Sequence, residues 1–556
     1  MTLLQRLAAL APHAPDPPEG LPAALALLDR PESAHEVARA ADLAALAGLL
    51  PLALAPLFGL AVLPLAVGLA LGIRELLRQG PLLLADAKRT RALGETPALV
   101  ARLVLRARLT PAPEAAAAFA ARGRGPLAGS LAGHVRRARG TGRSGLRAFG
   151  ETWGDRFPAL RRAVRLVETG AAAPEAERSD RFDRALDVVM EGTRHRAAEA
   201  ANALRGPATA LYAFGVLLPL ALVAVLPAAR VAGVPVSIPL VVALYDVLLP
   251  ACLLVAAAWL LARRPVAFPP TPVPRTNPAV PRWPWRALLA GTVVGVGGWL
   301  LAGFLLPGWT RPLAAVGGGV GTALVVAAAP VVAVREEVRA VEAGLPDAVA
   351  HVGHRVREGV AVETALAEVG EELGGATGDR FAAAARQNRQ LRVGVERAFC
   401  GEFGALASLP SRRGEHAAHL LAVAADAGRP AGQALVETGA HLTALQRVER
   451  EARRDLARVT DTLGNTAAVF GPLVGGATVA LAARTGGSQL GTAVPTPALG
   501  LAVGVYVLLL AALLAALATG LSRGLDRALV AHRAGVALLA ATATYLAAFV
   551  ATGLVA

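Results

Sequence analysis

Side chains that commonly carry out nucleotide or nucleophilic chemistry are not grouped in this sequence. A nucleotide-binding P-loop places a lysine after a glycine-rich loop so that it reaches the phosphates, but the only lysine, Lys88, has no glycine loop before it. Ser411 has His416 nearby, yet no third member of a catalytic triad accompanies them. The sequence therefore excludes a Walker-type ATPase, and if the protein works with ATP, another chain must hydrolyse it.

Metal-ligand residue types are equally scattered. His351 and His354 are three residues apart and Glu358 follows one turn later, but no second cluster joins these three ligand-type groups. Cys252 and Cys400 fall in separate segments, so no disulfide is expected, and Cys400 is expected to be packed rather than nucleophilic. We predict no catalytic residue, no metal site and no cofactor, and we do not expect an enzyme.

Asp246 is an ionisable residue in a strongly apolar setting. It follows Tyr245 near the middle of the apolar stretch 236–262, where a carboxylate costs about 2.5–3.5 kcal/mol on insertion scales, so it should face protein or water. In one interpretation it is protonated or hydrogen-bonded to Tyr245, Tyr212 or Thr209 and joins neighbouring spans. In the other it helps to move a substrate or partner.

The elements that must position these residues are membrane helices. The chain has 556 residues, 54% of them hydrophobic, with a net charge of +15 and a mean hydropathy of +0.50. This composition is too apolar for an ordinary soluble domain and predicts several spans. The apolar segments are much longer than strands, so the predicted class is all-α.

Seven segments have the roughly 20 apolar residues that a span requires. They are 208–228, 236–262, 287–306, 313–334, 462–483, 496–520 and 534–555. The first apolar run, 43–73, is longer, and Pro51, Pro56 and Pro64 predict that it forms a hairpin of two short spans. The predicted total is nine spans.

Arginine distribution predicts the orientation in the membrane. The loops 263–286 and 521–533 are arginine-rich, whereas the opposite loops carry one arginine each, so the first two are cytoplasmic. The blocks 74–206 and 335–461 then share that side of a plasma membrane. The expected organisation is a cytoplasmic segment without a signal peptide (1–42), a hairpin (43–73), block 1 (74–206), two spans (207–262), a proline-rich linker (263–286), two spans (287–334), block 2 (335–461) and three spans (462–556).

The two blocks repeat one pattern in direct order. Thr96-Pro97-Ala-Leu-Val precedes Leu345-Pro346-Asp-Ala-Val by 249 residues, and similar glycine, arginine and phenylalanine positions follow in both. Apolar residues from 345 to 370 recur at helical spacing, with a break predicted at Gly359. Each block is therefore predicted to be a helical bundle that runs into a span. Block 1 has 25 basic and 14 acidic residues, a net charge of +11, and block 2 has 17 and 19, a net charge of −2.

These stretches resemble the type II secretion system F-domain family. The resemblance rests on Leu345-Pro-Asp-Ala-Val, Arg357-Glu-Gly, the Gly394-to-Phe399 turn and Leu442-Thr-Ala-Leu-Gln-Arg, which leads into a span. Two such domains in one chain look most like the membrane platform of an archaeal type IV pilus or archaellum. The resemblance implies a platform that docks a cytoplasmic secretion ATPase and couples its motion to the insertion of pilin-like subunits.

Basic residues on both blocks are the expected docking surface for that ATPase. They are Arg143, Arg147, Arg161, Arg162, Arg392, Arg397, Arg453 and Arg454. The other expected partners are pilin-like subunits and membrane lipids. A homodimer is left open, and no nucleic acid is expected.

Two other classes of function compete with the platform. A transporter or channel using Asp246 predicts a flux that Asp246→Asn abolishes. A membrane-bound protein that binds nucleic acid or lipid through block 1 predicts strongly salt-dependent binding without a partner protein.

Overall fold

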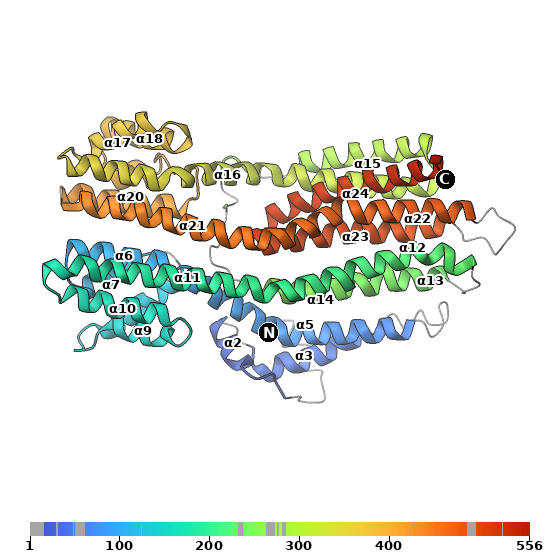
Figure 1. The fold of residues 1–556 in the computed structure, drawn as a ribbon, viewed down its shortest axis with the longest axis horizontal. Helices are drawn as coiled ribbons and strands as arrows, with labels where there is room; N and C mark the ends of the chain where they lie inside the picture. Colours follow the sequence, from blue (N-terminus) through green and yellow to red (C-terminus); the bar gives the residue numbers. More distant parts are fainter. Residues whose placement is uncertain are drawn as a thin grey trace.

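The computed structural model describes residues 16–28, 32–47, 49, 62–123, 125–231, 237–262, 273–274, 277–280, 285–428, 430–485, 496–524 and 526–555. Within these ranges the chain is all-α and contains no strand, which confirms the predicted class. The molecule is elongated, with the two helical blocks at one end and the apolar helices at the other (Figure 1).

Block 1 is a bundle of short helices that ends in a long one. Its helices are α6 (Thr96–Leu109), α7 (Pro113–Ala120), α8 (Pro126–Ala138), α9 (Gly145–Gly154), α10 (Pro158–Ala171) and α11 (Glu175–Tyr212). Prolines in the first turn start α6, α7, α8 and α10, where the missing N–H has no intrahelical acceptor to lose. Leu99, Phe149 and Phe182 are fully buried in its core.

Block 2 begins on a helix that it shares with the membrane. Its helices are α16 (Arg311–Arg357), α17 (Val362–Leu373), α18 (Gly375–Leu391), α19 (Val395–Cys400), α20 (Arg412–Ala427) and α21 (Pro430–Asn465). The predicted break at Gly359 is confirmed, because α16 ends two residues earlier and Gly359 has a φ of 100°, which favours glycine. The predicted boundary at 334/335 lies inside α16.

The helices of the two blocks follow the same order. α8 starts 249 residues before α18, the offset of the sequence pattern. In each half the long last helix passes through a π-helical segment, η3 (Ala213–Leu217) or η6 (Thr466–Phe470), into an apolar helix, α12 (Leu218–Val231) or α22 (Gly471–Thr485). Both blocks are therefore joined to apolar helices without a loop.

Seven helices among the described residues are long and apolar enough to cross a membrane. They are Glu175–Val225, Ile238–Leu261, Trp285–Leu305, Gly308–Arg357, Thr460–Arg484, Thr496–Arg523 and Arg527–Leu554. Each overlaps one of the seven clear segments predicted from the sequence and includes all but at most three of its residues, so the chain is a multi-pass membrane protein. The remaining elements are α13 (Ile238–Val241), η4 (Val242–Leu248), α14 (Leu249–Ala262), α15 (Trp285–Leu305), η5 (Gly308–Thr310), α23 (Thr496–Arg523) and α24 (Arg527–Val555).

The middle of the hairpin predicted at 43–73 lies outside the described residues. On either side of it, α3 (Ala34–Ala47) packs against α5 (Val62–Gly94), and α2 (Leu21–Leu27) lies beside them. Asp42 accepts a hydrogen bond from Arg74 at 2.6 Å and ties α3 to α5. Because α5 continues to Gly94, the predicted boundary at residue 73 falls within a helix.

Candidate functional site

Three of the four basic residues expected on block 1 lie on α9 and α10, and Arg143 lies two residues before α9. Ser144 caps α9 by accepting the Arg147 N–H at 3.1 Å and donates its hydroxyl to Glu168 on α10 at 2.6 Å. Arg147 also contacts Glu168, at 3.2 Å, but its side chain stays 66% exposed. Arg143 and Arg162 are exposed. The α9–α10 pair therefore presents guanidinium groups on a rigid, capped support.

The predicted docking arginines do not form one surface. Arg161 on α10 lies 3.5 Å from Asp155. Arg392 ends α18 with a left-handed φ of 49°, and Arg397 is exposed on α19. Arg453 binds Glu449 on α21, and Arg454 is exposed beside it. In Figure 1, α9 and α10 lie at one edge of the molecule and α17 and α18 at the opposite edge, so the eight arginines fall into three groups.

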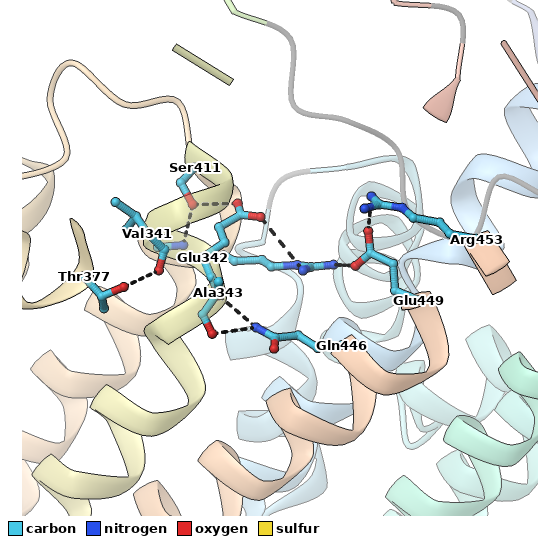
Figure 2. Close-up of polar contacts among 10 residues, drawn as sticks. Val341, Glu342, Ala343, Thr377, Ser411, Gln446, Glu449 and Arg453 are labelled. Carbon is cyan, nitrogen blue, oxygen red and sulfur yellow. Dashed lines mark hydrogen bonds and ion pairs between the residues drawn. The ribbon is translucent and has the colours of Figure 1, made fainter. Parts of the chain in front are cut away.

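A polar cluster joins α16, α20 and α21 within block 2 (Figure 2). The Ser411 hydroxyl donates to Glu342 at 2.7 Å, and Arg413 donates to Glu449 at 2.5 Å while lying 3.9 Å from Glu342. Gln446 donates to the Glu342 carbonyl at 2.8 Å. These bonds fix the relative positions of three helices, which is a structural role for Ser411 rather than a nucleophilic one.

Electrostatics in this cluster favour a charged arginine. Burial raises the pKa of the Glu342 carboxyl, although Arg413 and the Ser411 hydroxyl act against that shift. Burial would lower the pKa of Arg413, but the carboxylates of Glu449 and Glu342 outweigh it, and the net shift is upward. The cluster is therefore centred on Arg413, a cation shared by two carboxylates.

A second polar joint lies where α16 enters block 2. Arg335 pairs with Asp526, and their side chains are only 13% and 6% exposed. Asp526 also caps α24 by accepting the Ala528 N–H at 2.9 Å. The joint ties the start of block 2 to the loop between α23 and α24, the same two segments that the arginine distribution assigns to one side of the membrane.

Asp246 lies in the π-helical segment η4, and its neighbours use their hydroxyls elsewhere. Tyr245 donates to the Pro219 carbonyl at 3.2 Å and packs edge-on against Tyr506 with ring centroids 5.2 Å apart. Tyr212 accepts a hydrogen bond from Thr466 at 3.1 Å. One carboxylate oxygen of Asp246 is buried, and no described residue hydrogen-bonds to it. Tyr245 and Tyr212 thus connect neighbouring spans, whereas this Asp246 oxygen has no hydrogen-bond partner among the described residues.

The remaining sequence candidates lie apart from one another. No group of three or more His, Cys, Asp or Glu in the described part of the chain could hold a metal ion, and His351 Nδ1 lies 3.9 Å from a Glu372 carboxylate oxygen. The expectation that Cys400 is packed was wrong. Val395, Ala398 and Phe399 form the buried face of α19, which leaves Cys400 on the exposed side.

Sequence reasoning missed the seam between the blocks, which we define as the contact of α6 and α11 with α20 and α21. Arg108 on α6 donates to Asp183 on α11 at 2.6 Å and also pairs with Glu437 on α21. A cleft of about 720 Å³ opens beside this arginine, lined by Arg106, Arg178, Asp426 and Glu437 among others. No local pattern could have revealed it, because Arg108 and Glu437 are more than 300 residues apart in the chain.

Comparison of the chain with protein-family models, with curated proteins and with solved structures gives no match.

Proposed function

We propose that this chain is the integral membrane platform of a type IV pilus-like assembly or secretion machine. In this role both blocks lie in the cytoplasm, block 1 docks a secretion ATPase, and the membrane helices pass its motion to pilin-like subunits. The spans lie in the plasma membrane. The two blocks act as direct repeats of one domain, a view supported by their shared helix order.

One observation carries the proposal: each block is joined to the membrane by unbroken helix. α16 runs for 47 residues from the apolar region into block 2, and α11 and α21 leave the blocks through η3 and η6. Continuous helices between a cytoplasmic bundle and a membrane span can pass a push or a rotation across the boundary. A solvated loop at these junctions would not transmit such motion.

Docking on block 1 gives the first testable prediction. The double variant Arg143→Glu, Arg162→Glu reverses two exposed charges but leaves the Ser144–Glu168–Arg147 contacts intact. Co-purification of the full-length chain with the secretion ATPase of the same cells should fall several-fold at low salt, because screening is weakest there. Arg122→Glu, an exposed reversal on another turn of block 1, is the matched control. Equal recovery of the ATPase with the double variant and the control would rule out docking at α9–α10.

A transporter or channel is the second candidate, favoured by Asp246. A buried carboxylate oxygen without a described hydrogen-bond partner is unusual inside a span and often marks a transport pathway. In reconstituted vesicles, a transporter predicts a proton or sodium flux that Asp246→Asn abolishes. A platform predicts no such flux, and it predicts loss of filaments in cells that carry the block 1 double variant.

A further inference from the structure

The two blocks meet through charged side chains as well as apolar ones. Three pairs cross the seam in addition to Arg108: Arg194–Glu451 at 3.1 Å, Arg412–Glu95 at 3.7 Å and Arg102–His416 at 2.8 Å. The main apolar contribution from block 1 is Leu105, which is buried among the core residues of block 2. Interfaces of this polar kind between units of one chain generally permit relative motion.

Arg108 occupies a special place in the seam because its partners belong to different blocks. Asp183 lies on α11 in the same block as Arg108, whereas Glu437 lies on α21 in the other block. The Arg108 side chain is 14% exposed and Glu437 is 22% exposed. Both residues line the cleft, so solvent already reaches the side of this ion pair.

The sharing of Arg108 lowers the cost of separating the blocks. Breaking a buried ion pair is normally unfavourable because it leaves one charge buried without a partner. If the blocks part here, Arg108 keeps Asp183, and Glu437 becomes hydrated from the cleft. Neither charge is left both buried and unpaired. Separation also withdraws Leu105 from the core of block 2, and the exposure of this apolar side chain to water opposes opening.

The opposite end of the seam is held by contacts of another kind. Tyr212 at the end of α11 and Thr466 at the start of η6 are joined by a hydrogen bond of 3.1 Å at the level of the apolar helices. Arg108 and the cleft lie toward the other ends of α11 and α21, where Glu175 and Gln433 line the opening. A separation at the cleft would therefore pivot near the membrane.

We propose that the seam is a releasable joint in which Arg108 is the latch, so that the two blocks part at the cleft while α11 and α21 stay together at the membrane. In the closed state Arg108 binds Glu437 and Asp183, and in the open state it binds Asp183 alone. The inference concerns the chain itself and does not depend on the proposed platform function.

Spin-label distances in the full-length protein test the latch. Labels are placed at Ala172→Cys and Ala440→Cys, two exposed positions on blocks 1 and 2, in a chain that also carries Cys252→Ala and Cys400→Ala. Glu437→Gln should increase the longer-distance population several-fold. Glu371→Gln, an exposed carboxylate on α17, is the control and should leave the distribution unchanged.

Asp183→Asn distinguishes a latch from ordinary packing. This substitution removes the only partner of Arg108 in the open state and relieves the repulsion between two carboxylates in the closed state. The longer-distance population should therefore not increase. If Asp183→Asn and Glu437→Gln both lengthen the distance, loss of any contact of Arg108 weakens the seam and Arg108 is not a latch. If neither substitution lengthens the distance, Arg108 does not control the separation of the blocks. Either result would overturn the proposal.

Discussion

Two partly buried arginines, one in each block, are each shared between two carboxylates. Arg108 binds Asp183 and Glu437, and Arg413 lies between Glu449 and Glu342. A buried charge is tolerated when several opposite or hydrogen-bonding groups replace the water that it loses. Because the partners come from different helices, each shared arginine also fixes how those helices are arranged.

His441 adds a pH-sensitive group to the latch region. Its ring lies 4.0 Å from Asp183, with Asp187 and Arg108 also close, and burial lowers its pKa below the usual 6.5. The unfolded chain then binds more protons than the folded one as pH falls through 6.5, so folding stability decreases with acidification. The melting temperature should therefore drop less between pH 7.5 and 5.5 for His441→Gln than for the wild type. His419→Gln, at an exposed position on α20, is the matched control, and identical slopes for His441→Gln and the wild type would contradict the prediction.

Long helices are the elements that connect the blocks with the membrane, and glycines let them approach closely. A methyl group added at Gly353 on α16 would lie 2.7 Å from the Val436 amide nitrogen and 2.8 Å from the Gly432 carbonyl on α21. At Gly439 it would lie 2.7 Å from the Pro346 carbonyl. The two helices therefore pack backbone against backbone over several turns, which favours movement as one body.

Gly353→Ala tests this close packing. The new methyl group meets backbone atoms that cannot rotate away, so the variant should lose about 1–3 kcal/mol of stability. Gly464→Ala lies on α21 with open space around the added methyl group, and it should be neutral or slightly stabilising because alanine favours helix. Thermal unfolding of both variants in detergent gives the comparison. Equal melting temperatures would show that α16 and α21 are less tightly packed than described.

At the scale of the whole molecule, the sequence predicted the architecture more accurately than it predicted the contacts between distant helices. The all-α class, the seven clear spans and the break at Gly359 follow from local composition and spacing, and the structure has them. The Arg108–Glu437 pair and the separation of the docking arginines depend on how distant helices pack, which periodicity does not encode. The exposure of Cys400 depends on which face of a six-residue helix is buried, too short a segment for a period to show.

Accessibility of Cys400 tests the orientation of the molecule. With Cys252→Ala, the exposed Cys400 on block 2 is the only thiol. A membrane-impermeant maleimide should leave it unlabelled in intact cells and label it after lysis, because block 2 is predicted to be cytoplasmic. In a chain with Cys252→Ala and Cys400→Ala, Gly308→Cys in the opposite turn should be labelled in intact cells. The reverse pattern would invert the topology.

The unbroken course of α16 also has a mechanical consequence. From Arg335, held by Asp526, the helix continues to Arg357, a distance of about 33 Å at 1.5 Å per residue. A tilt of about 10° at the Arg335 joint would displace the far end by about 6 Å, slightly more than one helical turn. Because Arg335 lies near the middle of this 47-residue helix, the span end of α16 would move by a similar amount in the opposite direction. A tilt at the joint therefore couples the outer end of block 2 to α15 and α24, which pack against the span part of α16.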